Sequence, residues 1–381
     1  MKVFVIVGTR PEAIKMAPVY LALRDDPDLE PLLISTGQHR SMLDQVLEWF
    51  GLTPDHDLNL MAPRQTLSHV MSEAIKGLDQ LITEESPGAV LAQGDTATVC
   101  AAAIAAFHTR TPFGHVEAGL RTRNLDQPYP EEGYRQMASR IAHWHFCPTK
   151  RAMSALDAEC IAGERLLVGN TVIDALLQTA ARVGAPKTPL TRRHLALITG
   201  HRRENHGTRF DAAFNAIARL AEAHSDADFV YPVHLNPNVR EAAFERLQAI
   251  DNMTLIEPVA YPEMVALMKK AALILTDSGG VQEEAPSFGT PVLVMRDATE
   301  RQEAVEAGVC ELVGVDRDLI VRRGSEILAA ATHGDGNKRR AAPANPFGDG
   351  ASSKRIADCL AGRAIQPFVY KNVASAQTDK D

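Results

Sequence analysis

The chain has 381 residues, of which 45% are hydrophobic and 23% are charged, and its formal net charge is −8. This length favours two domains over one, because a single hydrophobic core seldom grows beyond roughly 250–300 residues. The composition is that of a globular protein and excludes a disordered chain. The negative charge argues against nucleic acid or a membrane surface as a partner, and no apolar run approaches the roughly 20 residues of a membrane span.

The cysteines are odd in number and widely scattered, at Cys100, Cys147, Cys160, Cys310 and Cys359. No two of them form a CxxC pair, so neither a disulfide framework nor a zinc knuckle is expected. This pattern predicts a cytoplasmic location, where thiols stay reduced.

Short β-rich segments alternate with helical segments in the first half of the chain. Strands are predicted at 3–7, 31–35, 89–93, 113–116 and 143–147, and helices at 12–24, 41–50, 66–82, 98–107 and 171–182. Such alternation is typical of βαβ units, which form a parallel sheet covered by helices on both faces.

The same pattern begins again after residues 183–189, a stretch with glycine and proline that we interpret as a linker. Strands are then predicted at 195–199, 229–233, 253–257, 273–277, 291–295 and 310–313, and helices at 209–224, 238–248, 261–270, 319–331 and 351–361. The sequence therefore predicts an α/β fold of two doubly wound, Rossmann-like lobes facing a cleft at the carboxyl ends of their strands.

The predicted boundaries follow from this repetition. Residues 1–168 would form the N-terminal lobe and 169–350 the C-terminal lobe. Residues 351–362 would form a C-terminal helix that crosses back to the N-terminal lobe, and 363–381 a tail.

The segment 273–286 reads LILTDSGGVQEEAP, a buried strand followed by two glycines and a helix start. Gly279 and Gly280 let the backbone approach a ligand closely, and the N–H groups of a helix start attract an anion. We predict that Ser278 and the two glycine N–H groups hold phosphate oxygens and that Glu284 accepts hydrogen bonds from ribose hydroxyls. The alternative is a tight turn whose acidic residues only favour a helix N-terminus.

The first predicted strand ends in GTRPE at residues 8–12. Arg10 and Lys15 then place two cations at a helix start, where they could clamp a pyrophosphate or remain a solvated pair. The segment is not a dinucleotide fingerprint, because GxGxxG is absent here and elsewhere. No nicotinamide cofactor is therefore expected.

Asp95, Glu117 and Glu131 lie just after predicted strands or at helix starts, in the motifs QGDT, GHVEAG and PYPEE. An acid at such a position is often only a helix cap. Three of them at one strand-end cleft favour acid–base chemistry, because that chemistry needs carboxylates in unlike environments.

The second lobe opens with TGHRREN at 199–205, where His201 follows a strand and precedes two arginines. This pattern fits either an anion and proton-transfer site or a basic surface turn. Arg301, after the strand at 291–295, could lie near the same phosphates as Ser278. His143 and His145 share a strand face, but no acid or cysteine lies at ligand spacing, so we predict core packing and no metal site.

The motifs GTRPEAIKMAP, HVEAGLR, TGHRREN and DSGGVQEEAP occur in this order along the chain. With them the sequence closely resembles the non-hydrolysing UDP-N-acetylglucosamine 2-epimerases from residue 1 to about residue 361. The resemblance implies a glycosyltransferase-B architecture, a homodimer and no cofactor. It also implies interconversion of UDP-GlcNAc and UDP-ManNAc, which supplies sugars for bacterial surface polysaccharides.

The resemblance further implies roles at matching positions. UDP would be held by Arg10, His201, Ser278, Gly279, Gly280, Glu284 and Arg301. The reacting sugar would be lined by Lys15, Asp95, Glu117, Glu131 and His201. An activating second UDP-GlcNAc would bind near Gln38, His39, Arg64 and Gln65.

Four residues depart from the usual family pattern. Gln93 stands in place of His, Tyr134 in place of Asn and Gln302 in place of Pro, and Ser41 stands where some activated members carry Gln. Tyr134 is the most consequential, because it lies one helical turn after Glu131 and on the same face. We expect it to affect the choice of sugar and the rate.

Inversion at C2 of an N-acetylhexosamine breaks a C2–H bond that no neighbouring carbonyl acidifies. Without a nicotinamide, UDP must leave C1 while a base removes the C2 proton, and UDP then adds back to the 2-acetamidoglucal with the proton delivered to the opposite face. Cations at the diphosphate would stabilise the leaving group. Asp95, Glu117 and Glu131 are the candidate proton donors and acceptors, and the face on which each acts is left open.

Three other interpretations compete with epimerisation. A glycosyltransferase of the same architecture would replace the returning UDP by an acceptor, although simple transfer does not need all three acids. A hydrolysing epimerase would release free ManNAc and UDP. A catalytically silent nucleotide-sugar sensor is the third, and the substitution by Tyr134 motivates it.

Overall fold

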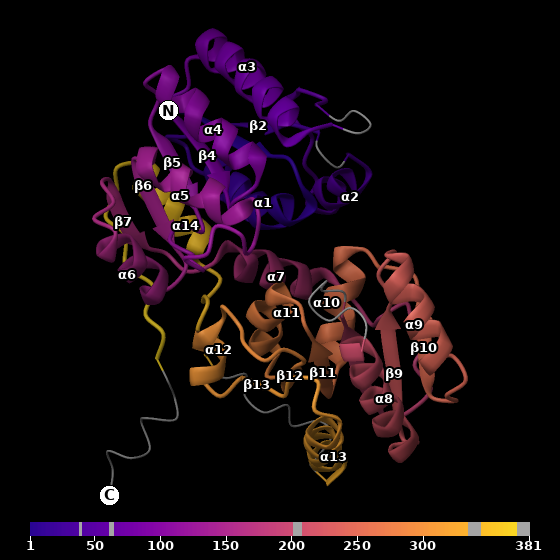
Figure 1. The fold of residues 1–381 in the computed structure, drawn as a ribbon. Helices are drawn as coiled ribbons and strands as arrows, with labels where there is room; N and C mark the ends of the chain where they lie inside the picture. The colour runs from indigo at the N-terminus through magenta and orange to yellow at the C-terminus, as the bar shows by residue number, and fades with distance from the viewer. Residues whose placement is uncertain (38–39, 61–64, 201–207, 334–343, 372–381) are drawn as a thin grey trace, which may run out of the picture. The chain divides into compact units, whose positions relative to one another are not determined.

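The computed structural model describes residues 1–37, 40–60, 65–200, 208–333 and 344–371, and the chain forms two compact units (Figure 1). Unit 1 comprises Met1–Leu177 and Phe347–Val369. Unit 2 comprises Gln178–Pro346 and the chain from Tyr370. None of the helices in the described ranges is both long and apolar enough to cross a membrane.

Among the described residues, unit 1 contains a parallel sheet of seven strands in the order β3-β2-β1-β4-β5-β6-β7. They are β1 (Lys2–Val7), β2 (Glu30–Ser35), β3 (His56–Asp57), β4 (Ala89–Gln93), β5 (Phe113–Val116), β6 (Trp144–Cys147) and β7 (Glu164–Leu167). The central strands β1 and β4 are buried on both faces because helices cover both. The chain order reverses between them, so the topological switch point of unit 1 lies where β1 and β4 end.

The helices of unit 1 pack on this sheet. They are α1 (Arg10–Arg24), α2 (Arg40–Phe50), α3 (Leu67–Glu85), α4 (Ala97–His108), α5 (Glu131–Ile141), α6 (Lys150–Ala158), the first part of α7 (Thr171–Arg182), and α14 (Ser352–Leu360). Helix α4 is rich in alanine, and its small side chains let it pack closely against α3, α5 and the sheet. Thr66, Thr96 and Thr149 each accept a hydrogen bond from the backbone two or three residues into the following helix, which stabilises its start.

The C-terminal segment returns to unit 1, where α14 lies against α1. Figure 1 shows α14 in yellow among the indigo and magenta elements of this unit. Asp174 on α7 accepts hydrogen bonds from the backbone N–H groups of Ser352 (3.3 Å) and Ser353 (2.7 Å) at the start of α14. These long-range bonds explain why the division between the units falls within α7, after Leu177, whereas the sequence placed it after residue 168.

Within its described part, unit 2 contains a parallel sheet of six strands in the order β10-β9-β8-β11-β12-β13. They are β8 (His194–Thr199), β9 (Ala227–Pro232), β10 (Met253–Ile256), β11 (Leu273–Thr276), β12 (Val292–Val294) and β13 (Cys310–Leu312). The helices are α8 (Thr208–Ala223), α9 (Pro237–Leu247), α10 (Tyr261–Lys270), α11 (Gly279–Glu284), α12 (Gln302–Glu306) and α13 (Arg317–His333). A 3-10 turn, Ala285–Phe288, follows α11. The switch point of this unit lies between β8 and β11.

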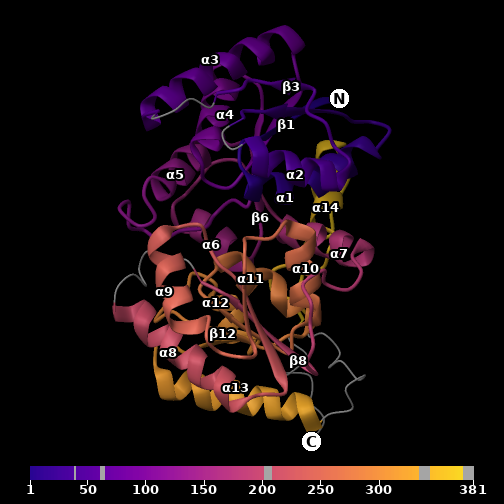
Figure 2. The same ribbon diagram turned by 90° about the vertical axis from the view of Figure 1, so that its right-hand side faces the viewer.

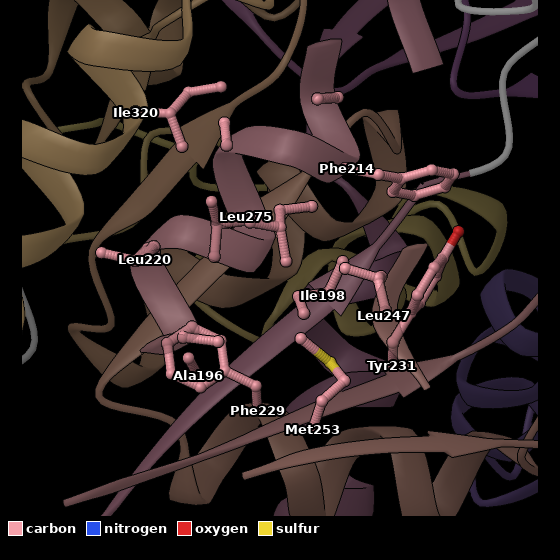
Figure 3. Close-up of a cluster of buried hydrophobic side chains, with 14 of the residues drawn as sticks. Ala196, Ile198, Phe214, Leu220, Phe229, Tyr231, Leu247, Met253, Leu275 and Ile320 are labelled. Carbon is pink, nitrogen blue, oxygen red and sulfur yellow. The ribbon is translucent and has the colours of Figure 1, made fainter. Parts of the chain in front are cut away.

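The core of unit 2 is formed by the sheet together with α8, α9 and α13. Helices α8 and α13 lie side by side (Figure 2). Figure 3 shows the buried side chains, with Ile198, Phe229 and Leu275 from the strands beside Phe214 and Leu220 from α8. Burial of such large apolar side chains is the dominant stabilising contribution in a doubly wound unit.

The predicted fold class, α/β with two doubly wound Rossmann-like lobes, is confirmed. The alternation of apolar runs did not reveal β3, β7, α5, α6 and α12. Strand β3 has only two residues, and β7 reads ERLL at the sheet edge, where half of its residues are exposed. Such short or edge elements lack the apolar periodicity that predicts a strand or helix.

Candidate active site

The carboxylate of Glu117, at the carboxyl edge of the first sheet, accepts hydrogen bonds from three described side chains. Glu117 follows β5 directly, and its side chain is 5% exposed. Lys15 Nζ on α1 donates to both carboxylate oxygens, at 2.7 and 2.6 Å. Gln93 Nε2, from the last residue of β4, donates to Oε2. Asn170 Nδ2, from the residue before α7, donates to Oε1 at 3.2 Å.

This environment favours the ionised form of Glu117, because a buried charge is tolerated only when it is paired and hydrogen-bonded. Glu117 also adopts a left-handed backbone conformation, with φ of 63°. A non-glycine residue in that region costs about 1–2 kcal/mol. Backbone strain of this kind is concentrated at functional sites, where the surrounding contacts impose it.

Asp95 occupies the loop between β4 and α4, beside the switch point of unit 1. Its Oδ2 accepts a hydrogen bond from Arg135 Nη2 on α5. Arg135 also lies 3.3 Å from the buried carboxylate of Glu132. Glu132 in turn accepts hydrogen bonds from the backbone N–H groups of Thr122 and Arg123, which holds the loop before α5. Asp95 is therefore held by a cation that is itself held by a buried acid.

Glu131 is the first residue of α5 and is half-buried. It lies four residues before Arg135, so the two side chains share a helical face, and that face contacts Asp95 through Arg135. Within the described ranges, the Glu131 carboxylate has no hydrogen-bond partner. Tyr134 is half-buried on the same helix, where burial raises the pKa of its hydroxyl. The structure thus places the three predicted acids along the edge formed by β4, β5 and the start of α5.

The buried carboxylate of Glu12 holds the segment that carries Arg10 by hydrogen bonds. Glu12 Oε2 accepts hydrogen bonds from the N–H groups of Gly8 (2.6 Å) and Thr9 (2.8 Å), and its Oε1 accepts from Thr96 on the loop after β4. A Cβ atom at Gly8 would lie only 2.4 Å from two threonine hydroxyls, so only glycine fits there. These contacts fix the loops after β1 and β4 together and set Arg10 at the first position of α1.

His115, on β5, contacts the backbone of the loop that carries Asp95, and no sequence motif indicated this contact. It is 1% exposed, and its Nε2 lies 2.7 Å from the carbonyl oxygen of Gly94, the residue before Asp95. Burial lowers the pKa of His115 to about 4, so the ring is neutral at physiological pH. A neutral ring whose Nε2 contacts a carbonyl carries its proton on Nε2 and donates it.

In unit 2 the turn Ser278-Gly279-Gly280 opens α11. A Cβ atom at Gly279 would lie 3.0 Å from Cζ of Arg301, so the guanidinium rests against the turn. Arg301 Nε also donates to Glu283 Oε1 at 2.9 Å. The two features that the sequence associated, the turn and Arg301, are therefore adjacent.

Gln282 and Tyr261 complete this arrangement, and neither was predicted to contribute. Gln282 accepts from Thr299 Oγ1 at 2.6 Å and donates to the Ser278 carbonyl at 3.1 Å, which ties the turn to the loop that carries Arg301. The Tyr261 hydroxyl donates to Glu284 Oε1 at 2.8 Å. The bonds from Thr299 to Gln282 and from Tyr261 to Glu284 join residues 17 and 23 positions apart, so no local motif could have revealed them.

The structure describes only some of the remaining predicted positions. His201, Gln38, His39 and Arg64 lie outside the described residues, so their roles stay predictions. Gln65 is described, and its amide donates to the Leu60 carbonyl. His145 is fully buried in β6, where Nε2 lies 2.8 Å from the Ala162 carbonyl, and burial lowers the pKa of its ring. Among the described residues, no group of three or more His, Cys, Asp or Glu side chains is arranged to hold a metal ion.

Fold and site together define a two-lobed α/β enzyme of the glycosyltransferase-B type, with acidic residues at the strand ends of unit 1. The chain belongs to the UDP-N-acetylglucosamine 2-epimerase family, whose model matches residues 21–361. A glycosyltransferase of kitacinnamycin shares the fold alone, at 13% identity and a TM-score of 0.60 over 94% of this chain and 97% of its own.

Relatives across bacteria support the family assignment. A probable UDP-N-acetylglucosamine 2-epimerase of Ralstonia nicotianae is 47% identical, over 96% of this chain and 99% of its own. The UDP-N-acetylglucosamine 2-epimerase of Escherichia coli K12 is 46% identical, over 96% of this chain and 100% of its own. The crystal structure of the UDP-GlcNAc 2-epimerase of Neisseria meningitidis bound to UDP-GlcNAc has a TM-score of 0.86 at 42% identity, and covers 95% of this chain and 100% of that one.

The burial of His115 predicts an acid-sensitive contribution to stability. Its folded pKa of about 4 lies below the usual 6.5, so between these values the unfolded chain binds a proton that the folded chain does not. The contribution is complete above about pH 6.5 and is lost as the pH falls through about 4. We expect His115→Gln to reduce the fall in unfolding free energy between about pH 7 and about pH 4.5 by about 2–3 kcal/mol, measured by urea titration.

His69→Gln, at an exposed position on α3, is the control and should leave the pH dependence as in the wild type. Equal pH dependence in His115→Gln and the wild type would contradict the assignment.

Proposed function

We propose that the protein catalyses the reversible C2 epimerisation of UDP-GlcNAc to UDP-ManNAc. The observation that carries the proposal is the arrangement at the edge of β4 and β5, where Glu117 and Asp95 occupy unlike environments in a chain of this family. Glu117 is surrounded by donors, whereas Asp95 is paired with one guanidinium. Unlike environments are what allow one carboxyl group to accept a proton while another delivers one.

The proposed reaction proceeds by elimination and re-addition. A carboxylate of the enzyme takes the proton from C2, the C2–H electrons form the C1–C2 double bond, and the C1–O bond breaks with its electron pair leaving on UDP. In the return step a diphosphate oxygen of UDP attacks C1, and C2 receives a proton on its opposite face. Atoms and charge balance without a nicotinamide. Glu117, Asp95 and Glu131 are the proposed proton carriers, with Lys15 beside Glu117.

The diphosphate is proposed to bind in unit 2, on the turn Ser278-Gly279-Gly280. The closeness of Arg301 to Gly279 supports this, because a guanidinium beside the N–H groups of a helix start suits a multiply charged diphosphate. Glu284, held by Tyr261, is the proposed ribose partner. Arg10 and His201 are the remaining proposed UDP contacts.

We also propose that the enzyme works in the cytoplasm and that its product is used for bacterial surface polysaccharides. All five cysteines are free thiols, which suits the cytoplasm. The product is an activated sugar, as the synthesis of bacterial surface polysaccharides requires. The fold is shared with a glycosyltransferase, so sugar transfer and a silent nucleotide-sugar sensor remain as alternatives that the experiment below separates.

A homodimer is proposed from the surface of unit 1. Leu67 on α3, Phe107 on α4 and Met137 on α5 are 45%, 64% and 47% exposed. The α4 helix packs against both α3 and α5, so these side chains belong to neighbouring helices of one unit. Exposed large apolar side chains on neighbouring helices of one unit support a surface there that another subunit covers.

Incubation with UDP-GlcNAc in deuterated water tests the reaction, because a C2 proton that is removed and returned is replaced by deuterium from the solvent. We expect NMR to show deuterium at C2 of both UDP-GlcNAc and UDP-ManNAc, with UDP still attached. Release of free ManNAc would replace the proposal by hydrolysis. Unchanged substrate would leave the transferase or the sensor.

Asp95→Asn tests the role of the acids. The amide keeps the size of the side chain but cannot carry the proton, so we expect kcat to fall at least about 10²-fold. The isosteric Asp251→Asn, at an exposed position of unit 2, is the control and should retain full activity. A near-normal rate for Asp95→Asn would remove this residue from the mechanism.

Phe107→Glu combined with Met137→Glu tests the dimer. Two buried, unpaired carboxylates at an interface are costly, so we expect the wild type to run as a dimer and the variant as a monomer in light scattering coupled to gel filtration. Leu235→Glu, at a 64% exposed position of unit 2, should remain dimeric. A monomeric wild type would contradict the proposal.

A further inference from the structure

Asn170 contacts Glu117 and was not indicated by any motif of the sequence. It is 2% exposed and precedes α7. Its Nδ2 donates to Glu117 Oε1 at 3.2 Å, its Oδ1 accepts from the Val172 N–H at 3.1 Å, and its own backbone N–H donates to the Phe347 carbonyl at 2.7 Å. One residue thus joins the acid, the start of a helix and the returning C-terminal segment.

The contact at Oδ1 determines how the amide is oriented. Because Oδ1 accepts from the second residue of α7, the side chain acts as the N-cap of that helix. The amide oxygen is thereby committed to α7, and Nδ2 must face Glu117. Asp is a comparably good N-cap residue, but an ionised aspartate offers no donor to a second carboxylate. The cap therefore accounts for the oxygen of Asn170, and the described partner of its nitrogen is Glu117.

The backbone position of Asn170 is fixed from the opposite side. Gly169 has φ of +89°, and a Cβ atom there would lie 2.7 Å from Ser352 Oγ at the start of α14. The chain before Asn170 therefore packs against α14 without room for a side chain. Together with the bond to Phe347, this contact places the amide by means of the C-terminal segment, about 180 residues away in sequence.

We propose that Asn170 is a positioning residue for proton transfer, which holds the Glu117 carboxylate ionised and oriented. This inference rests on the proposed epimerase function. Asn170 acts through Glu117 and takes no part in bond breaking. Its loss is therefore expected to slow turnover while substrate binding is retained, since the predicted UDP contacts lie elsewhere.

Asn170→Asp tests the inference, because the aspartate keeps the cap on α7 but replaces the donor by a second carboxylate. We expect kcat to fall about tenfold or more, as for the loss of a hydrogen bond to a charged group, with KM for UDP-GlcNAc changed less than about threefold. Asn170→Gly removes the donor without adding charge, at an N-cap position where glycine is tolerated, and should show the same division between kcat and KM. It decides the question if the aspartate variant does not fold.

Asp174→Asn is the matched control, because it weakens the junction of α7 and α14 without touching Glu117. We expect a lower unfolding midpoint and an unchanged kcat for this variant. Asn170 would be only a structural cap if its folded variants kept kcat within about twofold of the wild type, if Asp174→Asn lost kcat equally, or if neither Asn170 variant folded. A wild type without epimerisation would instead refute the proposed function.

Discussion

The hydrogen bonds to the carboxylate of Glu117 are the interaction on which the rest of unit 1 depends. Lys15, Gln93 and Asn170 reach it from α1, from the end of β4 and from the start of α7. A carboxylate buried to this degree would be strongly unfavourable without them. The elements that carry the donors must therefore keep their places for the acid to stay charged. The left-handed backbone at Glu117 is accepted for the same reason, because the contacts around it outweigh the local strain.

Buried residues around Asp95 hold its loop and its carboxylate in place. His115 holds the carbonyl before Asp95, Arg135 holds its carboxylate, and Glu132 holds Arg135. The closeness of α4 to the sheet, which its alanines permit, brings the loop after β4 against Glu12 and the loop after β1. Acid–base groups act at rates that depend on their placement within a fraction of an ångström. The buried residues that hold the acids in place therefore belong to the candidate site together with the acids.

Unit 2 has a comparable arrangement around the turn Ser278-Gly279-Gly280, which is held by residues from other elements. Gln282 links the turn at Ser278 to the loop that carries Arg301, and Tyr261 orients Glu284. A guanidinium held in this way would stabilise the multiply charged diphosphate of the proposed leaving group, UDP.

In unit 1, Gln93 donates a hydrogen bond from its side-chain amide to Glu117, and that amide does not itself titrate. The exchange of His for Gln at this position thus preserves a donor to the acid.

The sequence by itself determined the fold class, the succession of most strands and helices, and the positions of the acids and of the glycine turn after strands. These features are local: apolar periodicity and short motifs are encoded within about ten to twenty residues. The tertiary structure alone decided the strand order and hence the switch points beside Asp95 and Ser278. It also decided that Asn170, His115, Arg135 and Tyr261 support the predicted residues. Each of these depends on contacts between segments that lie about 20 or more residues apart, and no local pattern specifies which distant partner a side chain will meet.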